Sequence, residues 1–337
     1  MMKFYKIIFV NSMILGTMVA ISSYSWIGMW LGLEINLLSI IPLFSSTKNS
    51  YSSEAALKYF ISQTIASLIL LISIVLMLSL NEFVMSPANS TMMMMMNSAF
   101  LIKLGTAPFH FWFPEVMEGL TWNNCLILLT GQKIAPMILI MNNSMNLNFM
   151  FTIVVFSLIV STFMSFNQIS LRKILAFSSI NHMAWMISTM LFSFSVWMIY
   201  LLIYCLITFN IVMMFNQTNS FYFKQTLNLA NSNKLFKLLL YLNFLSLGGI
   251  PPFIGFLPKW LAVSLLVSKE NYFLPFVLIV FTLIMLFIYI RLMFSPMMIF
   301  QKETKLVKIN FSTSKFIFIS MTSLMSLIWS TYLFNFL

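Results

Sequence analysis

Apolar stretches of about 20 residues, the length of a helix that crosses a bilayer, follow one another along almost the whole chain. Only 7% of the 337 residues are charged, whereas 61% are hydrophobic. Soluble domains are about a quarter charged, because their surfaces need a polar shell. The sequence therefore predicts an all-α polytopic membrane protein and excludes a soluble fold.

Windows of this length predict about eleven membrane spans in a single membrane domain covering residues 1–337. The predicted spans are 5–24, 26–44, 55–80, 91–119, 121–141, 147–167, 173–193, 195–215, 236–268, 273–295 and 315–335. We expect residues 1–141 and 147–295 to form two halves. Residues 315–335 then add one C-terminal span.

Two predicted spans are too long for one straight crossing and contain glycine followed by proline. The residues that break them are Gly105 and Pro108 in the first, and Gly248, Gly249, Pro251 and Pro252 in the second. Proline removes a backbone donor, so each span is expected to be one helix interrupted within the membrane. Both breaks read Pro-Phe, four residues, Pro after a Leu-Gly, and their spans run in opposite directions. This pattern favours inverted repeats with an ion path at the breaks.

The distribution of basic residues supports the eleven-span threading. It places fourteen of the 18 Lys and Arg residues on one side and only Lys269 on the other, with Lys103, Lys133 and Lys259 inside spans. We therefore expect the N-terminus on the positive side. The net charge of +11 comes from scattered residues and not from the concentrated basic face that nucleic-acid binding needs, so no nucleic-acid partner is expected.

Four charges fall deep inside predicted spans: Glu34, Lys103, Lys133 and Lys259. A charge in hydrocarbon is costly, so such residues face the bundle interior and find partners there. The simpler interpretation is helix–helix pairing. Three of the four lie beside a helix break or Pro136, which favours a path for protons or cations. Burial disfavours the charged form of a lysine, so a lysine whose acidic partner moves could release and regain a proton.

Other polar residues give weaker indications. His110 follows the first break and His182 lies in a later span; either could relay protons, and together they could ligate a haem. His182 fits a hydrogen-bonded core histidine equally well. Glu54 and Lys58 are four residues apart in the order that favours a helical salt pair, with a role at a channel mouth as the alternative.

Motifs for redox or nucleotide chemistry are absent. Cys125 and Cys205 lie in apolar segments and have neither metal-ligand spacing nor a disulfide framework. The sequence has no Gly-rich dinucleotide fingerprint, no P-loop and no cysteine cluster for iron–sulfur. We therefore expect no cofactor or metal on this chain, and any ion pumping must be driven by an ion gradient or by partner subunits.

Six motifs together resemble the insect type of the mitochondrial NADH dehydrogenase subunit 2 family. They are Trp30–Asn36, Glu54–Phe60, Leu104–Val116, Leu171–Lys173, Ser178–His182 and Gly255–Trp260. The resemblance runs from near residue 12 to near residue 295. One departure is visible, because the family usually has Trp before Gln-Lys, where this chain has Gly131 before Gln132 and Lys133.

The resemblance implies a membrane-arm subunit of respiratory complex I with two inverted five-helix repeats, similar to cation/proton antiporters. By the same resemblance Glu34 and Lys103 form an ion pair, Lys133 is the central relay and Lys259 the exit-side proton site. Lys58 and His110 are implied as accessory channel residues, alongside the possible relay at His182.

The same resemblance implies the inner mitochondrial membrane, with the N-terminus in the matrix. The abundance of Met and Phe, 30 and 36 residues, fits a chain encoded in an AT-rich mitochondrial genome. The implied partners are antiporter-like and small membrane subunits and lipids such as cardiolipin, while FMN, iron–sulfur clusters and ubiquinone belong to other subunits. Two alternatives stay open: a stand-alone cation/proton antiporter, and a passive structural subunit that only couples its neighbours.

Overall fold

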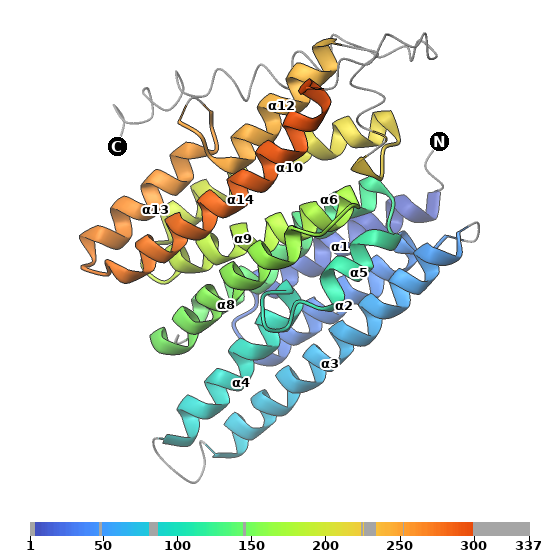
Figure 1. The fold of residues 1–337 in the computed structure, drawn as a ribbon. Coiled ribbons are helices and arrows are strands. Elements are labelled where there is room, and N and C mark those ends of the chain that lie inside the picture. The colour runs from blue at the N-terminus through green and yellow to red at the C-terminus, as the bar shows by residue number, and fades with distance from the viewer. Residues whose placement is uncertain are drawn as a thin grey trace. The chain divides into compact units, whose positions relative to one another are not determined.

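The computed structural model describes residues 4–46, 49–80, 87–143, 146–223, 225, 234–251 and 253–298. Regular structure in this part of the chain is helical, apart from one isolated antiparallel bridge between Ser170 and Tyr222 (Figure 1). The chain divides into two compact units, residues 1–153 and 154–337. The predicted all-α class is confirmed, whereas the predicted span 315–335 lies outside the described residues.

The helices of the first unit are α1 (Phe4–Ser22), α2 (Trp26–Phe44), α3 (Ser50–Leu80), α4 (Pro87–Leu104), α5 (Trp112–Gly119), α6 (Trp122–Leu129), α7 (Gly131–Asn142) and the start of α8 (Leu147–Ser165). Those of the second are the rest of α8, α9 (Leu171–Met190), α10 (Phe194–Thr218), α12 (Lys234–Gly248), α13 (Phe256–Ser268) and α14 (Phe273–Met298). These bounds agree with the predicted spans to within a few residues.

Seven helices in the described residues are long and apolar enough to cross a membrane, counting α6 and α7 as one span, Trp122–Asn142. Shorter apolar segments occur in α4, α12 and α13, which are the halves of the interrupted spans. α9 is less apolar, because it carries serine, asparagine and histidine, yet it is buried from Ile174 to Met190. The chain is therefore a multi-pass membrane protein, as predicted.

Both predicted interruptions are present, and the backbone forms the same cap at each. Gly105 and Gly249 adopt positive φ angles of 71° and 77°, a conformation that glycine reaches without a steric penalty. Each glycine N–H bonds the carbonyl three residues earlier, and the next residue's N–H bonds the carbonyl five residues earlier, at Leu101 and Leu245. This is the Schellman arrangement that ends a helix. α4 and α12 therefore stop partway along their predicted spans for the same local reason.

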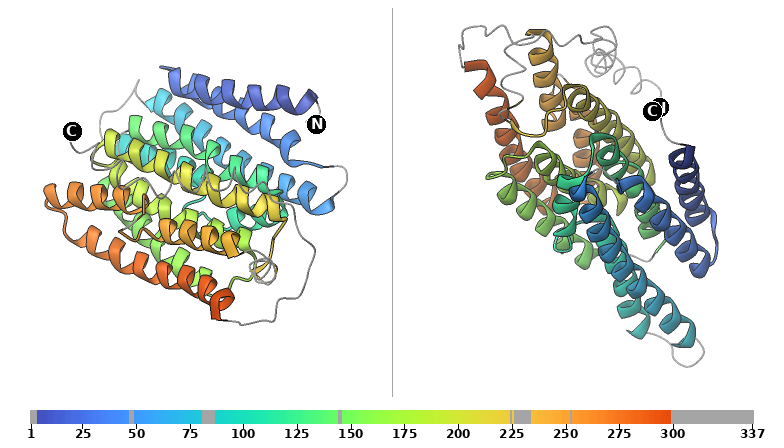
Figure 2. Two further views of the ribbon diagram at one scale, coloured as in Figure 1. Left: turned by 90° about the horizontal axis from the view of Figure 1, so that it is seen from above. Right: turned by 90° about the vertical axis from the view of Figure 1, so that its right-hand side faces the viewer.

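Close contact between glycines and backbone holds α2 against α1 in the first unit (Figures 1 and 2). A Cβ atom at Gly16 would lie 2.8 Å from the Asn36 backbone nitrogen, and one at Gly32 would collide with the Ala20 backbone. Small residues let membrane helices approach this closely. The packing places the buried face of α2, with Glu34 and Asn36 near its middle, beside the rest of the unit.

The long helix α3 packs against α2, α4 and α5, and Figure 1 shows it beside α4 as an antiparallel pair. A Cβ at Gly119 would lie 2.5 Å from the Tyr51 carbonyl oxygen, so α5 approaches the start of α3 closely. In the second unit, α13 packs against α9, α10 and α14, and α12 packs against α10 and α14. Each broken helix is thus surrounded by unbroken ones.

Candidate functional site

Lys103 stands in the last turn of α4, immediately before the first break. The side chain is buried, with 7% of its surface exposed. Glu34 of α2 acts on it electrostatically, but the ion pairs within 4.0 Å in the described residues are those of Lys58, so Lys103 and Glu34 do not touch. The Glu34 Oε1 atom is buried without a hydrogen-bond partner. The structure thus brings the two charges together across a gap instead of as the direct pair that the resemblance implies.

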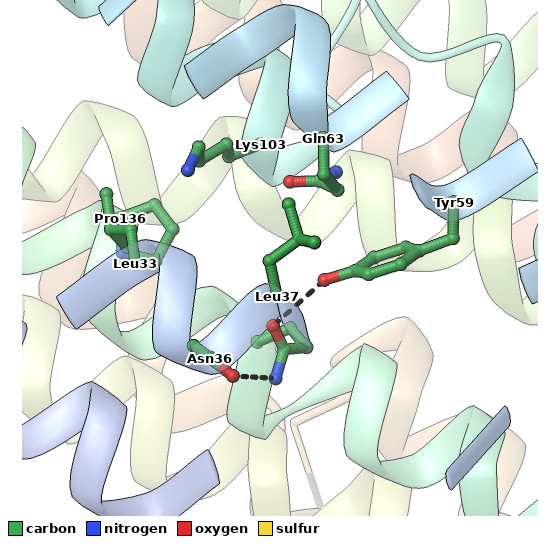
Figure 3. Close-up of a pocket in the computed structure, with 8 residues that line it drawn as sticks. Leu33, Asn36, Leu37, Tyr59, Gln63, Lys103 and Pro136 are labelled. Carbon is green, nitrogen blue, oxygen red and sulfur yellow. Dashed lines mark hydrogen bonds between the residues drawn. The ribbon is translucent and has the colours of Figure 1, made fainter. Parts of the chain in front are cut away.

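A small polar cavity lies beside Lys103 (Figure 3). Its polar lining comes from Asn36, Tyr59, Gln63, Lys103 and Gln132, and it offers about 10 Å³ to the centre of a water molecule. That is close to the smallest space that one water occupies. The Gln63 Nε2 group is a buried donor with no partner in the protein, which suits a site where water takes part.

Two hydrogen bonds cross this cavity and join three helices. The Gln132 side chain donates from Nε2 to Asn36 Oδ1 at 3.0 Å and accepts at Oε1 from the Tyr59 hydroxyl at 3.2 Å, shown as dashed lines in Figure 3. Tyr59 also packs edge-on against the rings of Phe44 and Trp112. Polar groups from α2, α3 and α7 therefore form a connected set next to Lys103.

Lys133 lies in the first turns of α7 and is buried, with 3% exposed. Its Nζ atom lies 5.3 Å from the centre of the Phe113 ring, within the range of a cation–π interaction. Phe113 belongs to α5, the helix that follows the first break. Lys133 of α7 therefore contacts α5, the helix that follows the first break.

The first break itself is held together by side chains. Trp112 donates from its indole Nε1 to the Ile102 carbonyl at 3.0 Å, which ties the start of α5 back to the end of α4. His110 is buried inside the break and stacks on Phe111 with ring centres 4.4 Å apart. The peptide bond between Ala107 and Pro108 is cis. His110 thus lies within the interrupted segment.

Lys58 forms two ion pairs at 3.0 Å, one with Glu54 on its own helix and one with Glu115 of α5. The Glu54 pair is the one that the sequence spacing predicted. The Glu115 pair is not visible in the sequence, because it depends on how α5 folds back onto α3. All three side chains are partly exposed, so this cluster lies at the rim of the first unit and not at its centre.

In the second unit, Lys259 lies in the first turn of α13, just after the second break. Its Nζ atom donates to the Gly248 carbonyl, the end of α12, at 2.7 Å. It also borders an apolar cavity of about 380 Å³ lined by Trp185, Trp260 and residues of the break. Among the described residues of this unit the acidic side chain is Glu270, beyond the far end of α13, so Lys259 has a backbone carbonyl and not a carboxylate as its partner.

His182 lies on α9 with 7% of its surface exposed. Its Nδ1 atom is 3.0 Å from the Tyr200 hydroxyl, and the Tyr204 ring packs 5.3 Å from its own. These contacts are those of a hydrogen-bonded core histidine, which the sequence left as an equal alternative to a relay. His110 and His182 belong to different units. No group of three or more potential metal ligands occurs among the described residues.

Sequence reasoning missed the amide and hydroxyl groups around Lys103. Asn36, Tyr59, Gln63 and Gln132 are uncharged, and single polar residues in apolar spans carry little signal of their own. One signal was available, since Asn36 follows Glu34 by two residues and Gln132 directly precedes Lys133. A polar residue next to a buried charge in the sequence indicates that both side chains lie in the interior of the helix bundle.

A buried lysine before one capped helix break and a partly buried lysine after the other, in an all-helical membrane chain, are the features by which we assign the class of antiporter-like membrane subunits. The solved structure of respiratory complex I from Thermus thermophilus contains a chain with the same fold, at a TM-score of 0.85 and 22% identity, covering 96% of this chain and 77% of that one. The Mrp complex from Dietzia gives a TM-score of 0.80 at 14% identity, covering 96% and 75%. The antiporter-like fold is thus shared.

Sequence comparison defines the family within this class. The family described as "NADH:quinone oxidoreductase/Mrp antiporter, TM" matches residues 23–287. The NADH-ubiquinone oxidoreductase chain 2 of Anopheles gambiae is 48% identical over 314 residues, covering 93% of this chain and 92% of the relative. That of Locusta migratoria is 41% identical over 326 residues, covering 96% and 95%. The chain belongs to the NADH-ubiquinone oxidoreductase chain 2 family, as its motifs predicted.

Proposed function

We propose that this chain translocates protons as a membrane-arm subunit of respiratory complex I. The observation that carries the proposal is the first unit's pair of buried lysines at a broken helix, Lys103 before the break and Lys133 against the segment after it. A buried charge has a high cost, so it is retained where it performs a task. The names of the relatives support membership of the complex.

The proposed path uses Glu34, Lys103, Lys133 and Lys259 as a relay, with Lys58, His110 and His182 as accessory groups. Glu34 and Lys103 interact without touching, so a small movement of α2 or α4 would change how strongly the carboxylate stabilises the ammonium. Such a change is what a lysine needs in order to release and regain a proton. Lys259, held by a backbone carbonyl, serves as the exit-side group.

The remaining parts of the proposal concern the setting. Residues 1–141 and 147–295 act as inverted repeats and 315–335 as an additional span. The chain lies in the inner mitochondrial membrane with its N-terminus in the matrix, and protons move towards the intermembrane space. FMN, iron–sulfur clusters and ubiquinone in partner subunits supply the redox chemistry. Antiporter-like and small membrane subunits and lipids such as cardiolipin surround the chain.

The test compares Lys103→Met with the parent in the assembled complex, in sealed vesicles fuelled by NADH. Methionine keeps the length and apolar stem of lysine but removes its charge, so assembly should survive while protons moved per electron fall. Lys269→Met is the matched control, because Lys269 is exposed at the end of α13 and should leave the ratio unchanged. An unchanged ratio in Lys103→Met would make this chain a passive structural subunit.

The stand-alone antiporter is the second candidate, supported by the shared fold of the Mrp complex. It predicts that the purified chain alone exchanges cations for protons in vesicles. The distribution of acidic side chains in the described residues weighs against an antiporter. Glu34 is the one carboxylate there that lies midway along a membrane-spanning helix, whereas a cation site needs several oxygen ligands. Exchange of cations for protons by the isolated chain would favour the antiporter over the complex I subunit.

A further inference from the structure

The helix that carries Lys133 is interrupted just before it. α6 ends at Leu129 and α7 begins at Gly131, and Thr130 between them has φ −117° and ψ −68°. The Lys133 N–H bonds the Thr130 carbonyl, three residues back, at 3.2 Å, where an α-helix would use the carbonyl four residues back. The backbone therefore departs from the regular ladder at the turn that positions the lysine.

Two neighbouring residues loosen this turn further. Pro136 has no N–H, so the Gln132 carbonyl receives no helical hydrogen bond from it. Gly131 is the least restrained residue type, and a methyl group built on it would meet nothing within 4 Å. Neighbouring side chains therefore neither require a glycine at position 131 nor restrain its backbone. The start of α7, defined by Thr130, Gly131 and Pro136, lacks part of the regular hydrogen-bond ladder, and we term it the hinge.

The Gln132 side chain bridges this hinge to two other helices. Its amide donates to Asn36 on α2 and accepts from Tyr59 on α3, as described above. Both partners are 3% exposed, so water does not compete freely for these bonds. Gln132 thus uses its amide nitrogen towards α2 and its amide oxygen towards α3, and one side chain ties α7 to both helices.

We infer that Gln132 is a positioning residue for Lys133: its amide ties the hinge at the start of α7 to α2 and α3, and so holds the lysine against Phe113. The inference rests on the proposed function, to which it adds the element that sets the geometry of the central relay. An amide side chain does not titrate near neutral pH, so Gln132 carries no proton itself. Its two partners also line the cavity of Lys103, so one tie sets both lysine sites.

The test is a double-variant experiment in the assembled complex. Gln132→Met keeps the length of the side chain and removes both hydrogen-bonding groups. We expect complexes that still assemble and oxidise NADH but move fewer protons per electron. Adding Gly131→Ala restrains the hinge, because alanine favours helical backbone over glycine by about four- to fivefold in equilibrium constant. The double variant should recover part of the lost ratio relative to Gln132→Met.

Matched controls accompany the pair. Gln168→Met removes an amide in the exposed loop after α8 that donates to the Met164 carbonyl, four residues back, and it should pump like the parent. Tyr59→Phe removes one of the two bonds and keeps the ring against Phe44 and Trp112, so a smaller loss, also recovered by Gly131→Ala, is expected. If Gln132→Met does not assemble, the Tyr59→Phe pair decides the question alone.

The outcomes separate this inference from the proposed function. If Lys133→Met loses pumping but Gln132→Met and Tyr59→Phe both pump like the parent, the inference is overturned and the proposed relay stands. Loss of pumping that Gly131→Ala does not recover overturns the positioning role, because a direct role of the amide would not depend on the hinge. Parental pumping in Lys133→Met itself refutes the proposed relay and, with it, the role in pumping of the hydrogen bonds of Gln132 to α2 and α3, which distinguishes failure of the relay from failure of the positioning role alone.

Discussion

Replacing Gly249 by alanine would act on the second break in two ways. Gly249 has φ 77°, and an L-residue with a side chain there costs about 1–2 kcal/mol. The new Cβ would also lie 2.8 Å from Lys259 Cδ and 2.9 Å from its Nζ, inside van der Waals contact. The end of a lysine side chain is flexible, so Lys259 would move while the backbone stays. Its ammonium would then leave the Gly248 carbonyl.

The two effects differ in size and in where they appear. Backbone strain lowers the stability of the break by about 1–2 kcal/mol. Loss of the 2.7 Å hydrogen bond from Lys259 to Gly248 removes a bond to a charged group, worth about 1.5–3 kcal/mol, and changes the position of the proposed exit-side lysine. The first effect reduces the thermal stability of the complex, and the second reduces pumping.

The assay measures protons per electron in sealed vesicles, together with the amount of assembled complex. We expect Gly249→Ala to assemble and to pump less. Gly248→Ala should pump more than Gly249→Ala, because its Cβ would meet Leu286 no closer than 3.5 Å. Gly105→Ala places the same backbone strain at the first break, where its Cβ would lie 3.1 Å from Phe113, so it leaves Lys259 and the second break unchanged. Equal pumping by Gly249→Ala and the parent would refute the link between this glycine and Lys259.

Two further substitutions test the first unit. Phe113→Leu keeps an apolar side chain but removes the ring under Lys133, which stabilises the ammonium by about 0.5–2 kcal/mol. We therefore expect a lower proton-to-electron ratio in a complex that still assembles. A parental ratio would contradict this prediction. Gly32→Val would push a side chain into the Ala20 backbone, so α1 and α2 should separate. The amount of assembled complex, measured on native gels, should then drop. Parental amounts would show that this contact is not required.

Apolar run length was sufficient to predict the helices. The span predicted at 26–44 is α2 as observed, and most other ends differ by a few residues. The breaks were also predictable, because glycine closely followed by proline in a span too long for one crossing favours an interruption there. The caps at Gly105 and Gly249 use the same hydrogen bonds: each glycine is the left-handed residue after the helix end, which is Leu104 in the first break and Gly248 in the second.

The contacts between helices were not predictable from the chain alone. Glu115 is near Lys58 only because α5 returns along α3, and Gln132 meets Asn36 and Tyr59 only because the fold brings the start of α7 next to α2 and α3. Such pairs join residues far apart in the sequence, and no local pattern encodes them. The gap between Glu34 and Lys103 belongs to the same group, because it depends on helix positions to within a few ångströms.

The two breaks place a lysine in a similar electrostatic setting by different routes. The last carbonyls of a helix carry partial negative charge, which favours a cation nearby. Lys103 reaches that end of α4 by standing in its last turn. Lys259 follows the second break, yet its ammonium reaches back to Gly248, the last residue of α12. Because both ammonium groups depend on where a half-helix ends, a shift of either break by one turn would alter the charge environment of its lysine without altering any side chain. The capped breaks, and not the lysines alone, are therefore the elements through which movement of the helices would act on the proposed relay.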